Sequence, residues 1–153
     1  MSSENLTIVE NFEQAALYER DFEKAMQYAH PDLTVREAPS LPYRGTYVGL
    51  EGQRQLLADV DRLFEFDGGA PKVEFRDAGD DLVIGRVTGR ARLRATGEEI
   101  DFLVIELFTI RDGKLADIEV FYWDQAALLR AGEAERAAAE RASAERAGAE
   151  EPA

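Results

Sequence analysis

The sequence contains no cysteine and a single histidine, His30. The lack of cysteine excludes disulfide bonds, thiolate metal sites and a cysteine nucleophile, and one histidine cannot build a multi-histidine metal site. No hydrophobic run approaches the roughly 20 residues of a membrane-spanning helix, and the first residues lack the basic and apolar regions of a signal peptide. We therefore expect a cytoplasmic protein that uses no metal and no cofactor and does not contact membranes.

Basic residues are also scarce: 18 Lys and Arg stand against 31 Asp and Glu, which gives a formal net charge of −13. Such a field repels phosphate backbones, so nucleic acid is not an expected partner. The 153 residues, of which 45% are hydrophobic, are enough for one compact domain with a buried core.

Helical patterns precede strand patterns along the chain. Apolar residues recur at helical spacing over Glu4–Tyr18, in a short segment after Asp21 and over Gly49–Phe66. A short strand is expected at Thr34–Glu37, and four strands that form an antiparallel meander are expected at Lys72–Arg76, Asp81–Ala95, Glu99–Arg111 and Lys114–Trp123. This order predicts an α+β domain in which a curved antiparallel sheet wraps around three N-terminal helices.

Two further segments carry structural expectations. Gly85 and Gly89 lie on one face of the second meander strand, where glycines permit kinks and leave room for a ligand. Residues 131–153 are almost entirely alanine, glutamate and arginine and contain no large apolar residue. We therefore expect a domain over residues 1–130, followed by a tail that is either a frayed helix or disordered.

Alternation along the strands identifies three acidic candidates, because alternate strand residues face the same side. Glu106 shares a face with Phe102, Val104, Phe108 and Ile110, Glu37 shares one with Val35, and Asp124 follows Ile118, Val120 and Tyr122. A carboxyl group buried among apolar side chains raises its pKa and can then donate a hydrogen bond. Each candidate has a simpler interpretation: Glu106 in an ion pair with arginine or facing water, Glu37 exposed at a strand end, and Asp124 capping a terminal helix.

Apolar and aromatic residues on the same faces are candidates for a binding pocket, although aromatic residues at such spacing commonly belong to the core. The candidate substrate-binding residues are Tyr18, Tyr43, Phe102, Val104, Phe108, Val120 and Tyr122. The strand Glu99–Arg111 also carries Leu103, Ile105 and Leu107 on its opposite face. Something must cover that second apolar face, so we expect a two-fold homodimer through the sheets.

The element order, the stretch His30–Gly45 and the ending Ile110–Asp124 together resemble the nuclear transport factor 2-like superfamily over about residues 5–130. The closest branches are the ketosteroid isomerases and the SnoaL-like polyketide cyclases. The resemblance implies a cone-shaped α+β fold with a deep internal pocket.

The resemblance also assigns roles to individual acids. Thr34-Val35-Arg36-Glu37 is similar to the isomerase segment that carries the general base, which places Glu37 in that role. Ile105-Glu106-Leu107-Phe108 is similar to the segment that carries a protonated acid of the oxyanion hole, which makes Glu106 the neutral donor. Asp124 is similar in position to the acid of the cyclases, and Phe12 stands where isomerases place a tyrosine donor.

The resulting hypothesis is a cofactor-independent acid/base enzyme that acts on an apolar, carbonyl-bearing small molecule, by isomerisation or by aldol-type cyclisation. Two alternatives stay open. An epoxide hydrolase or dehydratase would use the same pocket, and a dimeric ligand-binding module would have no catalytic activity.

Overall fold

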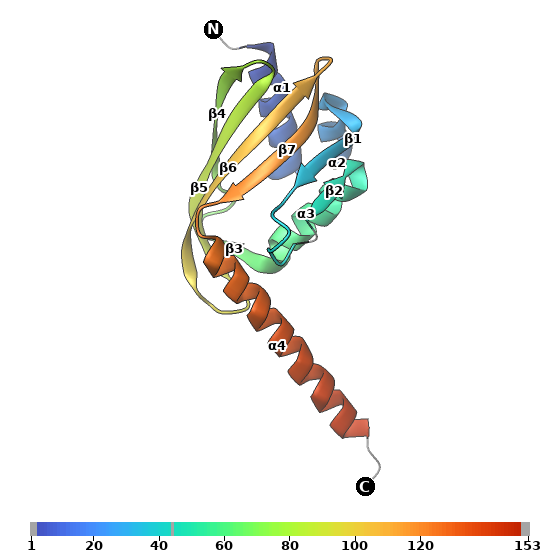
Figure 1. Ribbon diagram of the computed structural model, residues 1–153, viewed down its shortest axis with the longest axis vertical. Helices are drawn as coiled ribbons and strands as arrows, with labels where there is room; N and C mark the ends of the chain where they lie inside the picture. Colours follow the sequence, from blue (N-terminus) through green and yellow to red (C-terminus); the bar gives the residue numbers. More distant parts are fainter. Residues whose placement is uncertain (1–2, 44, 151–153) are drawn as a thin grey trace.

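The computed structural model describes residues 3–43 and 45–150 (Figure 1). The N-terminal part is helical, with α1 (Glu4–Glu13) continuing into a π-helical turn, η1 (Gln14–Tyr18). The remaining elements are α2 (Phe22–Ala25), η2 (Met26–Tyr28), β1 (Ala29–Arg36), β2 (Thr46–Val48), α3 (Gly49–Leu63), β3 (Phe64–Phe66), β4 (Lys72–Gly79), β5 (Leu82–Leu93), β6 (Glu99–Arg111), β7 (Lys114–Tyr122) and α4 (Gln125–Glu150).

Seven strands form one curved sheet in the order β2-β1-β7-β6-β5-β3, and β4 also pairs with β5. The antiparallel meander from β4 to β7 and the α+β fold class are confirmed. The sheet is nevertheless mixed, because β1 runs parallel to β7. A parallel neighbour requires a long crossover, and here the chain between β1 and β7 supplies it.

The third helix is shorter than the sequence pattern indicates. Phe64 leaves the helical conformation (φ −118°, ψ 143°) and pairs with Leu93, so that Phe64–Phe66 forms β3 on β5. The apolar residues of Phe64–Phe66 are compatible with either a helix or a buried strand. Hydrogen bonding to β5 makes this segment a strand. The short β2, which pairs with β1, is a further strand that the pattern did not predict.

The helices that precede β4, among them α1 and α3, cover one face of the sheet (Figure 1). Phe12 on α1, Leu33 on β1 and Phe108 on β6 are completely buried in a single core between them. Packing is close at Gly85, where an added Cβ would lie 2.8 Å from Phe108 and 3.3 Å from Phe75. The expectation that Gly85 leaves room for a ligand is therefore wrong, because aromatic rings fill that space.

The C-terminal segment is one continuous helix, α4, which begins at an aspartate cap: Oδ1 of Asp124 accepts a hydrogen bond of 3.1 Å from the amide of Ala127. Leu128 and Ala131 are buried against the body, so the contact continues past residue 130. Beyond this contact the helix projects away from the sheet (Figure 1). The helix extends through Glu150. None of the helices in residues 3–43 and 45–150 is long and apolar enough to cross a membrane.

Candidate active site

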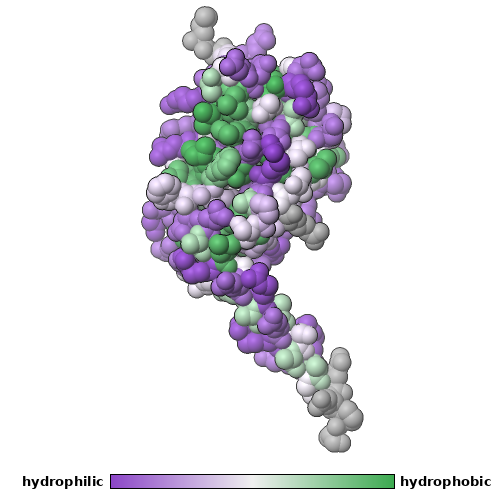
Figure 2. Space-filling view, viewed as in Figure 1, coloured by the Kyte–Doolittle hydropathy of each residue, from purple (hydrophilic) through white to green (hydrophobic). Residues whose placement is uncertain are grey.

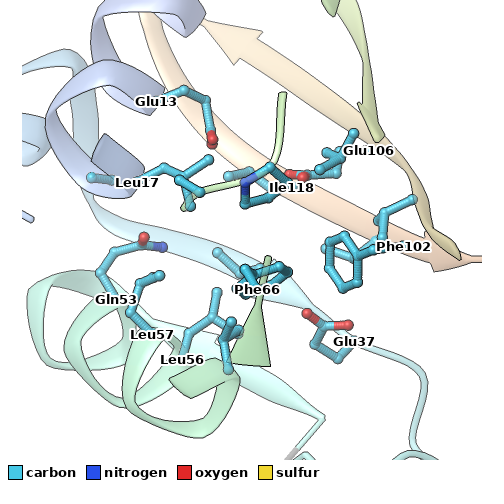
Figure 3. Close-up of a pocket in the computed structure, with 18 of the residues that line it drawn as sticks. Glu13, Leu17, Glu37, Gln53, Leu56, Leu57, Phe66, Phe102, Glu106 and Ile118 are labelled. Atoms are coloured by element: carbon cyan, nitrogen blue, oxygen red, sulfur yellow. The ribbon is translucent and has the colours of Figure 1, made fainter. Parts of the chain in front are cut away.

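A cavity of about 280 Å³ lies between the helices and the concave face of the sheet (Figure 3). This volume is near the small end of the range for ligand pockets, and its wall is mostly apolar, as such pockets usually are. The apolar part of the wall comes from α1 and η1, α3, the β3–β4 segment and four strands: Phe12, Ala16, Leu17, Val35, Leu56, Leu57, Val60, Phe66, Ala70, Pro71, Val87, Phe102, Val104, Ile118 and Val120.

Glu37 follows the last residue of β1 and continues its alternation, so that its side chain faces the cavity together with that of Val35. The Glu37 amide donates a hydrogen bond of 2.6 Å to the carbonyl of Gly45, which holds the backbone at this point. The residue is only 6% exposed, and its Oε2 has no hydrogen-bond partner among the residues that the structure describes. The interpretation of Glu37 as an exposed strand-end residue is therefore wrong.

Glu106 lies in the middle of β6, opposite Gly85 on β5 and Val120 on β7. It is half-buried and lines the cavity. No ion pair to its carboxyl group was found within residues 3–43 and 45–150, so the expected alternative of an arginine partner has no support.

Glu13, the last residue of α1, is a third acid on the cavity wall that the sequence analysis missed. It is 9% exposed. A signal was present, since Glu13 lies four residues after Val9 and three before Ala16, within the apolar face of the first helix. Figure 3 shows the carboxyl groups of Glu13, Glu37 and Glu106 directed from three sides toward the space between them.

Burial shifts the protonation of all three acids. It raises the pKa of Glu37 to about 8, and the nearby charge of Glu106 adds to this shift. Burial also raises the pKa of Glu106 to about 7. The pKa of Glu13 is raised well above its ordinary value, first by burial and then by the charge of Glu106. Near neutral pH the cavity therefore holds protonated and ionised carboxyl groups together.

A fourth buried acid, Asp59 on α3, shows how this chain treats a structural carboxylate. Asp59 is 2% exposed and accepts hydrogen bonds from the Tyr47 hydroxyl (2.7 Å), the Gln55 amide (3.2 Å) and the Arg62 guanidinium (2.7 Å). Buried polar groups in folded proteins are normally satisfied in this way. Within the described part of the chain, the unpartnered oxygen of Glu37 departs from this rule, and a functional role would explain the departure.

The structure divides the other candidate residues into two groups. Phe102, Val104, Val120 and Tyr122 line the cavity as expected. Tyr43 lies behind Tyr122, whose hydroxyl donates to the Tyr43 hydroxyl at 3.1 Å, and the two rings are stacked.

Besides Tyr43, three more candidates lie away from the cavity wall, and each has a structural role instead. Phe108 is completely buried and packs edge-on against Phe75, with ring centroids 5.7 Å apart. Asp124 caps α4, as its simpler interpretation held. Tyr18 is 45% exposed, and its hydroxyl donates to the Pro71 carbonyl at 2.8 Å.

The cavity opens beside exposed wall residues of the β3–β4 segment and of the turn after η1, namely Gly69, Ala70 and Arg20. Arg20 makes two hydrogen bonds to the carboxylate of Asp61, at 3.1 and 3.2 Å. His30 is remote from this region and donates to the Arg111 carbonyl at 2.7 Å. Within the described part of the chain, no group of three or more acidic or histidine side chains is arranged to hold a metal ion.

Comparison with known proteins agrees with this architecture. Residues 9–118 match the family of the SnoaL-like domain. The chain belongs to the SnoaL-like family. No match was found among curated proteins.

Solved structures of SnoaL-like and NTF2-like proteins share the fold. An NTF2-like protein from Burkholderia xenovorans LB400 is 25% identical, with a TM-score of 0.68 over 86% of this chain and 98% of its own. A protein from Mesorhizobium loti classed as a SnoaL-like polyketide cyclase is 22% identical, with a TM-score of 0.59 over 76% and 97%. An LEH-like epoxide hydrolase from M. tuberculosis is 20% identical, with a TM-score of 0.56 over 84% and 91%.

Proposed function

We propose that this SnoaL-like protein is a cofactor-independent enzyme that transfers protons on an apolar, carbonyl-bearing small molecule, by isomerisation or by aldol-type cyclisation. One observation carries the proposal: the carboxyl groups of Glu13, Glu37 and Glu106 converge in a mostly apolar cavity. Because burial raises the pKa values of Glu37 and Glu106 to about 8 and about 7, proton donors and acceptors coexist near the pH at which acid/base catalysis is most efficient.

Glu37 is the general base of this proposal. Its Oε2 is unpartnered among the described residues and faces the cavity, so it can accept a proton from a carbon beside a carbonyl group. With a pKa of about 8, its ionised form is a stronger base than an exposed glutamate. The fraction of Glu37 that is ionised grows as the pH approaches 8.

Glu106 supplies the proton donor, together with Glu13. The mutual repulsion of two neighbouring carboxylates in the cavity keeps a proton on this pair when one of them is ionised. The retained proton can hydrogen-bond to the carbonyl oxygen and stabilise the enolate as charge develops there. Glu13 thus provides a proton donor on the first helix, the element in which the resemblance places a tyrosine donor.

The test measures exchange of α-protons for deuterium in cyclohexanone, acetophenone and 2-tetralone by proton NMR in D₂O. Wild-type protein should accelerate exchange in at least one of these ketones, and Glu37→Gln should reduce the acceleration by about 100-fold or more. Glu133→Gln, at an exposed position of α4, is the matched control. Exchange at the buffer rate with wild-type protein, or equal rates with Glu37→Gln, would overturn the proposal.

Epoxide opening is the alternative reaction for the same carboxyl groups, since a carboxylate that can take a proton from carbon can also take one from water. Incubation with a small apolar epoxide in ¹⁸O-labelled water distinguishes it: a labelled diol would indicate hydrolysis. A non-catalytic binding module predicts well-solvated acids, and the burial of Glu37 opposes that alternative.

We also propose that the protein forms a two-fold homodimer through the outer face of the sheet. Figure 2 shows apolar side chains gathered over the strands on the viewed face. Ile105 and Leu107 on β6 are only half-buried, while Phe121 on β7 is 52% exposed beside Ile105. Sedimentation velocity should show a dimer that Phe121→Glu converts to monomer, and a monomeric wild-type protein at tens of micromolar would refute the dimer.

A further inference from the structure

The wall of the cavity is asymmetric in charge. Three carboxyl groups face the space, from α1 (Glu13), the end of β1 (Glu37) and β6 (Glu106). Among the described residues on the wall, the one basic side chain is Arg20, at the mouth, and its guanidinium is already bonded to Asp61. Whenever these carboxyl groups are ionised, they repel an anionic ligand and attract a cationic one.

The unpartnered oxygen of Glu37 adds an independent observation. A carboxyl oxygen in a residue that is 6% exposed, with no partner among the described residues, lacks the hydrogen bond that buried polar groups normally have. Asp59 receives three donors from its own chain, whereas this oxygen of Glu37 faces the cavity with no partner in residues 3–43 and 45–150. For the ionised form of Glu37, the missing partner is a hydrogen-bond donor, which a ligand can bring.

Aromatic rings surround the same space. Phe12, Phe66, Phe102 and Tyr122 line the cavity, and Phe66 and Phe102 meet edge to face with centroids 5.1 Å apart. Ring faces attract cations, and apolar walls accommodate a hydrocarbon body. Carboxylates combined with aromatic rings are a recognition set for an ammonium group.

We infer that the cavity binds small organic ammonium ions, in which a protonated amine is carried on an apolar body, and that such a group forms part of the substrate. The inference rests on the proposed function in so far as it places the substrate among the same three carboxyl groups. It adds the charge class of that substrate, which acid/base chemistry alone leaves open.

Binding of a cation in this cavity must change the number of protons that the carboxyl groups hold. The ammonium ion favours ionised carboxylates, whereas burial favours the protonated acids, so binding below pH 8 releases protons to solvent. The other titratable or charged groups that face these acids are Tyr122, Tyr43, Tyr18 and Arg20. The three tyrosines stay protonated throughout this range, because their pKa values are raised above the ordinary value of 10.

The experiment compares benzylamine, benzyl alcohol and benzoate, which share one apolar body and differ in charge. Isothermal titration calorimetry at pH 7.5 should show benzylamine binding about tenfold or more tightly than benzyl alcohol, the preference expected of one charge-assisted hydrogen bond, and benzoate more weakly than both. At pH 6.5, the benzylamine enthalpy should vary with the ionisation heat of the buffer, which reports proton release. Equal affinities of the amine and the alcohol, no detectable binding of the series, or no proton release would overturn the inference.

Variants test which carboxyl group produces the preference for amine over alcohol. Glu37→Gln should lose most of the preference for amine over alcohol while it still binds benzyl alcohol, and Glu133→Gln should match the wild type. If the preference persists in Glu37→Gln, the same comparison in Glu106→Gln tests whether Glu106 produces it. A preference unchanged in both variants would refute a site among these acids. Ketone exchange that depends on Glu37 without any amine preference would refute this inference alone, whereas amine preference without exchange would refute only the proposed function.

Discussion

The ionisation of Glu37 should make the protein less stable as the pH rises. In the folded state its pKa is about 8, whereas the unfolded chain returns it to about 4.5. The folded state therefore binds more protons between these values, and its stability is fully present below about pH 4.5 and is lost as the pH rises toward 8. At about 1.36 kcal/mol per pKa unit, the loss from this one group between pH 5 and pH 8 is about 3 kcal/mol.

Glu37→Gln removes this ionisation while it keeps the shape of the side chain. We expect the free energy of unfolding of the variant to lie within about 1 kcal/mol of the wild type at pH 5 and to exceed it by about 3 kcal/mol at pH 8. Glu106 and Glu13 still lower stability in both proteins as the pH rises, because burial raises their pKa values too. The informative quantity is thus the difference between variant and wild type at each pH.

Urea unfolding followed by circular dichroism at pH 5, 6, 7 and 8 measures this difference, with Glu133→Gln on the exposed part of α4 as the control. The control should track the wild type at every pH. A Glu37→Gln difference that stays constant with pH, or that grows toward acidic pH, would show that Glu37 is not a buried acid with a raised pKa.

Three further predictions concern the site and its supports. The rate of ketone exchange should rise with pH up to about 8, because the ionised fraction of Glu37 grows, and fall again where the donor pair loses its last proton; a profile flat from pH 6 to 8 would contradict this. Gly85→Ala should lower the free energy of unfolding by about 1–3 kcal/mol in urea, because its Cβ would meet Phe108, and a neutral effect would show that the ring can move. Asp124→Ala should cost about 1 kcal/mol by removing the cap of α4 at Ala127 and leave exchange unchanged; lost exchange would restore Asp124 as a catalytic acid.

The sequence was sufficient to predict the α+β class, the meander and two of the three acids. Strand alternation is a strong signal, because it shows which side chains share a face of the sheet. It places Glu106 on the same face as the apolar residues beside it. Glu13 is harder to predict, because a helical pattern is recognised by its apolar residues and a single acid among them does not change that pattern. The spacing from Val9 to Ala16 was enough to place it.

Other features depend on tertiary pairing that no local pattern contains. The parallel alignment of β1 with β7 follows from the long crossover between them, and β3 forms because β5 offers an open edge beside Phe64. Likewise, alternation can show that Phe108 faces inward without showing that Phe75 covers it. Burial can thus be read from a sequence more readily than contact with a cavity.

The hydrogen bond from Tyr18 to Pro71 has a kinetic consequence. Pro71 lines the cavity beside its exposed mouth residues, so this bond fastens one edge of the opening to η1. One such bond contributes roughly 1 kcal/mol, which corresponds to about a fivefold change in how often the edge is released. Because this bond does not involve the three carboxyl groups, it can set the residence time of a ligand through equal changes in the rates of entry and exit, while the equilibrium affinity stays the same.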